Sequence, residues 1–161
     1  TSVAVGDILI GYKSNSIHAN GWSLVRRVLN KFPGEVSDEE LHAWLQPTRL
    51  YHDVTDDLKK SNVKPKAMSH ITGGGLPENL ERLFRGMGAD LQIPRWKLPG
   101  IEKLLSHVDA EDCFHTINMG IGWVAIVAES DVEAALKAGD GGTVLGKMVA
   151  QEGVRVCVIG Q

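Results

Sequence analysis

The sequence predicts an α/β domain of the α+β type, in which helices pack on a mixed β-sheet. Strand patterns and helix patterns are interspersed along the 161 residues without strict alternation. The apolar run 121–128 is the best candidate for a central buried strand. With 43% hydrophobic and 23% charged residues, residues 1–161 have the composition of a single globular domain, long enough to form a core without cross-links.

The predicted strands are short apolar runs bounded by turn-forming residues. The first follows Gly6-Asp7, begins at Ile8 and ends near Tyr12. The other runs that fit strands cover residues 66–71, 89–93, 121–128, 143–149 and 154–159.

Helices are predicted where apolar residues recur at every third or fourth position. The first occupies 22–32 and is stopped by Pro33-Gly34. The second begins after Ser37, because Ser37 and Glu40 have the spacing of a capping box. The apolar residues that define the later helical faces are Leu41, Trp44 and Leu45; Leu50, Val54 and Leu58; Leu76, Leu80, Leu83 and Phe84; Ile101, Leu104, Leu105 and Val108; and Val132, Ala135 and Leu136.

The composition excludes several classes of protein. Seventeen basic against 20 acidic residues give a net charge of −3, whereas nucleic-acid modules usually carry a basic surplus. Two cysteines are too few for a disulfide framework. No apolar run approaches the ~20 residues that cross a bilayer, and the N-terminus lacks the pattern of a signal peptide. We expect a cytoplasmic protein with neither a nucleic acid nor a membrane as partner.

A glycine-rich loop is the most informative polar segment. Gly73, Gly74 and Gly75 stand between a predicted strand and a predicted helix, with Pro77 suited to the first helical turn. Such a loop can present backbone N–H groups to a phosphate. His70 precedes it and could act as a donor or as a general acid or base. The alternative is a tight strand–helix connection without a ligand.

Two further loops are candidates for the same end of the sheet. Ser16, His18 and Asn20 lie in a polar segment after the first strand, and ligands of open α/β sheets often bind at strand ends. The alternative is a solvated loop that caps a helix. Asn118 lies in a turn before the strand 121–128, where a purely structural turn is the alternative. Arg49 could pair with a phosphate or, as is more common, with a carboxylate.

No metal site is expected. Glu111, Asp112, Cys113 and His115 do not have the spacing of a known metal site, and a capped helical turn explains them better.

Three stretches together resemble a known family. They are HITGGGLPENL (70–80), SIHANGWSLVRRVL (16–29) and FHTINMGIGWV (114–124), and GDILIG (6–11) and PTRLY (47–51) extend the match in the same order. They are similar to motifs of the aminoimidazole ribonucleotide synthetases, also called phosphoribosylformylglycinamidine cyclo-ligases. Related ATP-using families that share this domain type are formylglycinamidine ribonucleotide synthetase, selenophosphate synthetase and thiamin-monophosphate kinase.

The resemblance covers the C-terminal domain of that two-domain enzyme family. It implies that an N-terminal domain holds ATP and Mg²⁺, supplies the principal homodimer contact and is a partner of this domain. The start at Thr1 without methionine fits a piece of the longer enzyme, and a natural standalone domain is the alternative. On this interpretation the isolated domain is inactive.

The resemblance also implies an activity and roles for individual residues. The family is a ligase of purine biosynthesis that uses ATP to close the imidazole ring of formylglycinamidine ribonucleotide. His70 and then His18 are the candidates for proton transfer. Backbone N–H groups of the glycine loop would bind phosphate, with Asn20, Ser16 and Asn118 orienting the substrate. The alternative function is a non-catalytic domain of a related enzyme that binds a phosphate-bearing ligand or serves in assembly.

Overall fold

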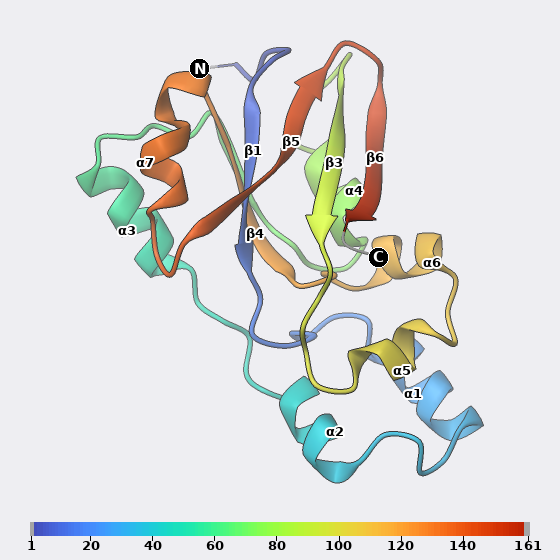
Figure 1. The fold of residues 1–161 in the computed structure, drawn as a ribbon. Helices are drawn as coiled ribbons and strands as arrows, with labels where there is room; N and C mark the ends of the chain where they lie inside the picture. The colour runs from blue at the N-terminus through green and yellow to red at the C-terminus, as the bar shows by residue number, and fades with distance from the viewer. Residues whose placement is uncertain (1, 160–161) are drawn as a thin grey trace.

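The computed structural model describes residues 2–159. In this part of the chain six strands form one mixed sheet in the order β2-β4-β1-β5-β3-β6 (Figure 1). The strands are β1 (Ile8–Lys13), β2 (Ala67–His70), β3 (Gly88–Pro94), β4 (Ile121–Val127), β5 (Gly142–Val149) and β6 (Gly153–Ile159). The α+β fold with a mixed sheet is therefore confirmed.

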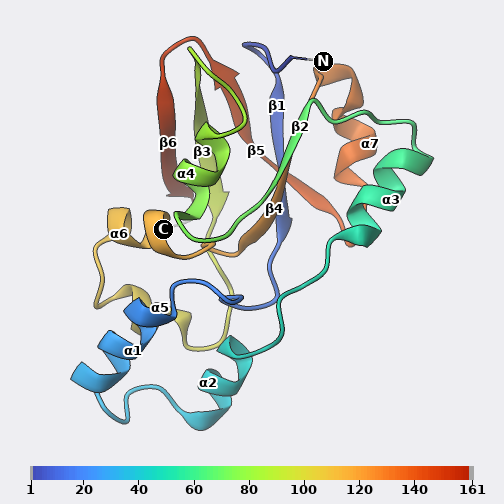
Figure 2. The same cartoon turned by 180° about the vertical axis from the view of Figure 1, so that it is seen from behind.

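Seven α-helices surround the sheet in the described residues. They are α1 (Trp22–Lys31), α2 (Asp38–Trp44), α3 (His52–Lys60), α4 (Gly75–Glu81), α5 (Ile101–Leu105), α6 (Ala110–Thr116) and α7 (Val132–Leu136). Figures 1 and 2 show α4 against one face, α7 and α3 toward the other, and α1, α2 and α5 beyond one end of the strands. None of the described helices is long and apolar enough to cross a membrane.

Strand direction places the loops. β1 is antiparallel to β4 and β5, β2 is antiparallel to β4, β3 is antiparallel to β5, and β6 is parallel to β3. Strands β1, β2, β3 and β6 therefore run in one direction, and their carboxyl ends lie at the same edge of the sheet. We call this edge the carboxyl edge; the loop after β1, the glycine loop after β2 and the turn before β4 all lie there (Figure 1).

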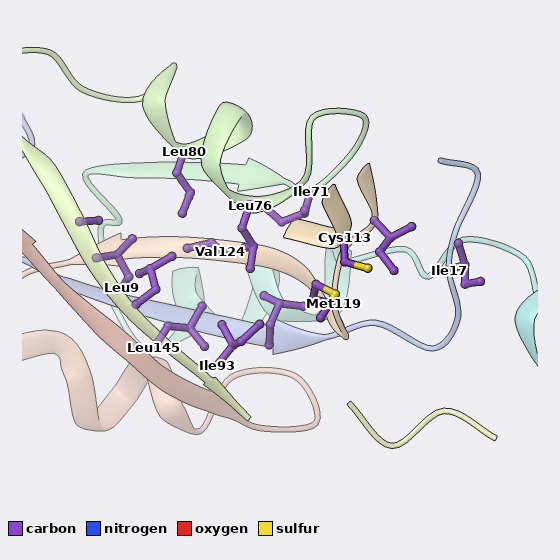
Figure 3. Close-up of a cluster of buried hydrophobic side chains, with 14 of the residues drawn as sticks. Leu9, Ile17, Ile71, Leu76, Leu80, Ile93, Cys113, Met119, Val124 and Leu145 are labelled. Atoms are coloured by element: carbon purple, nitrogen blue, oxygen red, sulfur yellow. The ribbon is translucent and has the colours of Figure 1, made fainter. Parts of the chain in front are cut away.

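The core is divided by the sheet into two clusters, as the alternation of side chains in β1 shows. Leu9 points into the larger cluster, whereas Ile10 and Tyr12 point into the smaller one. Figure 3 shows the larger cluster, where Leu76 and Leu80 of α4 pack over the sheet. The smaller cluster lies under α3 and α7. Because both faces of β1 and β4 are covered, the sequence of β4 is an almost continuous apolar run.

The capping box at α2 is confirmed. The Ser37 hydroxyl accepts a hydrogen bond from the Glu40 amide, and the Glu40 carboxylate accepts one from the Ser37 amide. Residues 111–115 lie in α6, where the Asp109 carboxylate caps the first turn. The capped helical turn predicted here from the sequence is confirmed.

Two predicted core residues are wrong. Leu45 and Leu50 are 56% and 72% exposed. Helix α2 ends at Trp44 and α3 begins only at His52, so both leucines lie in the connection between the helices. They continue the apolar spacing of the helices but are not part of either helix.

Gly146 is expected to be the least replaceable glycine of the sheet, because a methyl group there would overlap the backbone carbonyl of Asp90 on β3. We predict that Gly146→Ala lowers the free energy of unfolding by about 3 kcal/mol or prevents folding. Gly34→Ala is the matched control: its φ of +81° costs about 1 kcal/mol, and its methyl group meets open space. Urea unfolding of both variants is the measurement, and equal losses would contradict the prediction.

Candidate functional site

The carboxyl edge brings together four aromatic side chains from four segments. The ring centroids of His18 and His70 are 5.7 Å apart, and Tyr51 lies 6.3 Å from His18 and 5.8 Å from His70. Trp123 of β4, the strand partner of His70, stacks on Tyr51 at 5.6 Å. We call these four residues the aromatic cluster. The two predicted histidines are thus neighbours in space.

Gly122 makes this arrangement sterically allowed. A methyl group at position 122 would overlap the Tyr51 hydroxyl and lie 2.7 Å from Cε1 of His18. The Tyr51 hydroxyl instead donates a hydrogen bond to the Lys13 carbonyl at 3.0 Å. The missing side chain therefore lets two rings approach the start of a central strand.

The hydrogen bonds around His18 define its tautomer. Nε2 of His18 lies 3.1 Å from Oδ1 of Asn15. That oxygen also accepts from the Arg49 amide, and the Asn15 amide nitrogen donates to the Pro47 carbonyl, which together fix the orientation of the Asn15 side chain. Nε2 therefore carries the proton, and Nδ1 is a bare acceptor.

Both histidines are neutral near pH 7. Burial lowers the pKa of His18 to about 4, with smaller contributions from His70 and Arg49, and His18 is only 4% exposed. Burial also lowers the pKa of His70 below its ordinary value. A neutral imidazole can accept a proton, whereas an imidazolium cannot.

Three ring nitrogens of the aromatic cluster lack a partner. Nδ1 of His18, Nε2 of His70 and Nε1 of Trp123 are buried and form no hydrogen bond within residues 2–159. Buried polar atoms are normally satisfied, so three such atoms in one cluster indicate a place where a ligand or water binds.

Arg49 braces the cluster. Its guanidinium pairs with Asp53 and Asp140, each at 2.8 Å, and lies over the Tyr51 ring at 4.9 Å from the centroid. The pairing with carboxylates that the sequence favoured is confirmed. Tyr51 and Trp123 were not identified as site residues from the sequence, although Arg49 and Tyr51 both belong to the PTRLY segment.

The glycine loop lies close to the loop after β1. The position a Cβ would take at Gly73 is 3.8 Å from Oδ1 of Asn20. The amides of Gly73 and Gly74 make no hydrogen bond among the described residues, whereas the amide of Gly75 donates to the Thr72 carbonyl at 3.0 Å. Gly75 also packs against the backbone of Phe114, where a side chain would not fit. Gly73 and Gly74 therefore have the amides available to a phosphate.

Asn79 clamps the glycine loop from within. Its Nδ2 lies within hydrogen-bond distance of the carbonyls of Thr72, Gly73 and Gly75, at 3.2, 3.1 and 2.7 Å, and its Oδ1 accepts from the Thr72 hydroxyl. The residue stands in the HITGGGLPENL motif, but its type alone did not reveal this role.

Ser16 and Asn118 hold the loop after β1. The Ser16 hydroxyl accepts from the His18 amide and donates to the Gln46 carbonyl. Nδ2 of Asn118 donates to the carbonyls of Ser16 and Ile17, and Oδ1 accepts from the Gly120 amide and the Ser14 hydroxyl. Both side chains are buried. Their contact with substrate stays a prediction, and the geometry gives them a positioning role.

Within residues 2–159 no group of three or more His, Cys, Asp or Glu side chains is arranged to hold a metal ion. Cys113 is buried, and its burial raises the pKa of the thiol to about 11. The thiol is therefore protonated and inert at neutral pH.

The fold and these motifs define a class. Residues 4–159 match the family described as AIR synthase related protein, C-terminal domain, and the chain belongs to this family. Within it, the chain is similar to phosphoribosylformylglycinamidine cyclo-ligases. It is 40% identical over 148 residues to the one from Prochlorococcus marinus, a match that covers 85% of this chain and 43% of the relative.

Solved structures show the same fold. Phosphoribosylformylglycinamidine synthase II from Thermotoga maritima superimposes with a TM-score of 0.58 at 9% identity, over 99% of this chain and 24% of that one. Thiamine-monophosphate kinase from Stenotrophomonas maltophilia gives 0.60 at 18% identity, over 96% and 51%. This chain thus spans less than half the length of the curated relative and only part of each structural neighbour.

We predict that Asn79→Ala loosens the glycine loop, because the substitution leaves carbonyls without their donor. The expected loss in the free energy of unfolding is about 2 kcal/mol, and amide hydrogen exchange at 72–75 should accelerate. Asn30→Ala, on an exposed position of α1, is the control. Unchanged exchange at the loop would show that Asn79 does not hold it.

Acid should destabilise the protein through His18. The unfolded chain takes up the proton near pH 6.5 and the folded chain only near pH 4, so stability is lost as the pH falls through this window. We expect about 2 kcal/mol of loss between pH 7 and pH 5 from this group.

Urea unfolding at the two pH values measures that loss. His18→Asn should make it smaller, and asparagine tolerates the φ of +63° at this position. An identical pH dependence in the variant and the parent would refute the assignment.

Proposed function

We propose that this chain is the C-terminal domain of an ATP-dependent cyclo-ligase of purine biosynthesis. The reaction converts formylglycinamidine ribonucleotide to 5-aminoimidazole ribonucleotide. The observation that carries the proposal is the pair of neighbouring histidines, His18 buried and His70 half-buried, whose buried ring nitrogens lack a partner beside the glycine loop. The similarity to the cyclo-ligase of Prochlorococcus marinus supports the choice of reaction.

The chemistry of ring closure explains why such histidines are useful. ATP activates the formyl oxygen of the substrate by phosphorylation; a neighbouring nitrogen then forms the new C–N bond as the C–O bond breaks and phosphate leaves. The attacking nitrogen must lose a proton. Nδ1 of His18 is a neutral acceptor at pH 7, and Nε2 of His70 is the second buried nitrogen at the same place. We assign proton transfer to this pair.

The remaining residues bind and orient. The amides of Gly73 and Gly74 would donate to a phosphate group, with Gly75 packing the loop onto α6. Asn20 lies beside Gly73 and would orient the substrate. Ser16 and Asn118 would act through the loop that carries His18, since their side chains hold its backbone.

The rest of the active site would come from an N-terminal domain. In this proposal that domain holds ATP and Mg²⁺ and makes the homodimer contact, and the isolated chain has no turnover. Its support is that the chain covers only 43% of its cyclo-ligase relative. We place the enzyme in the cytoplasm.

A second candidate is a non-catalytic domain of a related enzyme that binds a phosphate-bearing ligand or serves in assembly. The fold is shared with a phosphoribosylformylglycinamidine synthase and a thiamine-monophosphate kinase, so the fold by itself fits this candidate equally well. Ligand binding without activity in any reconstituted pair of domains would favour it.

The test uses this chain together with an N-terminal domain from a cyclo-ligase relative, expressed separately or fused. Product should form from formylglycinamidine ribonucleotide and ATP only when both domains are present. His70→Ala should lower kcat/KM by about 10²–10⁴-fold, while His52→Ala, on an exposed position of α3, leaves it unchanged. Normal kcat/KM in His70→Ala would remove His70 from the mechanism. If no reconstituted pair of domains forms product, the second candidate is favoured.

A further inference from the structure

A separate cavity of about 500 Å³ opens at the carboxyl edge, outside the aromatic cluster and the glycine loop. Its volume falls in the range of pockets that bind small molecules. The cavity is lined by Lys13, Ser14, Asn15, Pro94, Arg95, Trp96, Lys97, Leu98, Met119, Gly120, Ile121 and Thr143. We call it the basic cleft.

Strand direction explains why three cations gather in the basic cleft. Strands β1 and β3 run in the same direction on the two sides of β5. Lys13 ends β1, and Arg95 and Lys97 directly follow the end of β3. Thr143, near the start of β5, lies between them. Three basic residues from segments far apart in the sequence therefore line one opening.

The charge of the basic cleft is not neutralised by the protein. No aspartate or glutamate is among its lining residues. Within residues 2–159, none of Lys13, Arg95 and Lys97 forms an ion pair, whereas nearby Arg49 is paired with Asp53 and Asp140. A concave site with three uncompensated cations and low-dielectric walls attracts an anion.

Trp96 supplies a rigid aromatic wall. It is half-buried and packs on Gly120, where a Cβ would lie 2.6 Å from Cδ1 of the indole. Gly120 has a φ of +87°, and its amide is held by Oδ1 of Asn118 at 2.8 Å. Because the backbone under the ring is fixed, the ring offers a preorganised apolar surface beside the three cations.

The lining therefore combines three features in one cavity. Cations match a phosphate, the indole matches a planar base or the apolar side of a sugar, and the Thr143 hydroxyl matches a sugar hydroxyl. We propose that the basic cleft binds a nucleoside monophosphate, with its phosphate against Lys13, Arg95 and Lys97 and its base on Trp96. The inference uses neither histidine of the aromatic cluster and does not rest on the proposed function.

The test is isothermal titration calorimetry of this chain with adenosine 5′-monophosphate, ribose 5-phosphate and adenosine at low salt. We expect saturable binding of the monophosphate at one site and weaker binding of the two partial ligands. The double variant Arg95→Gln/Lys97→Gln should weaken the monophosphate at least tenfold. The control pair Arg26→Gln/Arg27→Gln, on exposed positions of α1 that do not line the cleft, should leave Kd unchanged.

Trp96→Ala should weaken the monophosphate at least fivefold but leave ribose 5-phosphate unaffected, and Trp96→Phe should restore most of the loss. Circular dichroism verifies that each variant is folded; the charge variants change only exposed side chains and test the cleft even if Trp96→Ala does not fold. The proposal is overturned if the parent chain shows no saturable binding or if Arg95→Gln/Lys97→Gln binds the monophosphate normally. It is also overturned if the single variant Gly73→Val abolishes binding, because that result would place the ligand at the glycine loop.

Discussion

Strands β4 and β5 are each inserted between two strands that run the other way, and this constraint determines where the chemistry of the protein can lie. It forces β1, β2 and β3 to end at one edge, so that His70, the loop with His18 and the basic residues after β3 are delivered to the same side. The antiparallel start of β4 brings Gly122 and Trp123 to meet them. A sheet with a different strand order would separate these groups.

The electrostatics of this edge depend on burial more than on net charge. The protein carries a net charge of −3, and the guanidinium of Arg49 near the histidines is neutralised by two carboxylates. What distinguishes the aromatic cluster is burial, which lowers the pKa of His18 to about 4 and also lowers the pKa of the half-buried His70. The basic cleft is the opposite case, with charges that remain solvated and unpaired.

Local sequence patterns predicted the elements well and the site only in part. The strands, the capping box at Ser37 and the glycine loop follow from local propensity, which one sequence carries. The prediction that Leu45 and Leu50 lie on buried helical faces was wrong, because periodicity does not show where a helix ends. The contact between His18 and His70 was not derivable from spacing, since it depends on the order of strands. The sequence did not predict a role in the site for Tyr51, Asn79 or Trp123. Their roles come from contacts with residues distant in sequence or with backbone carbonyls.

The carboxylate of Glu78 sits beside Gly74, at the place a side chain on that glycine would occupy, and Arg82 lies 3.8 Å from it on the next turn. The glycine loop therefore carries its own competing anion. On the function proposed above, a phosphate at Gly74 would have to displace the Glu78 carboxylate, and Arg82 is the cation that the displaced carboxylate already pairs with.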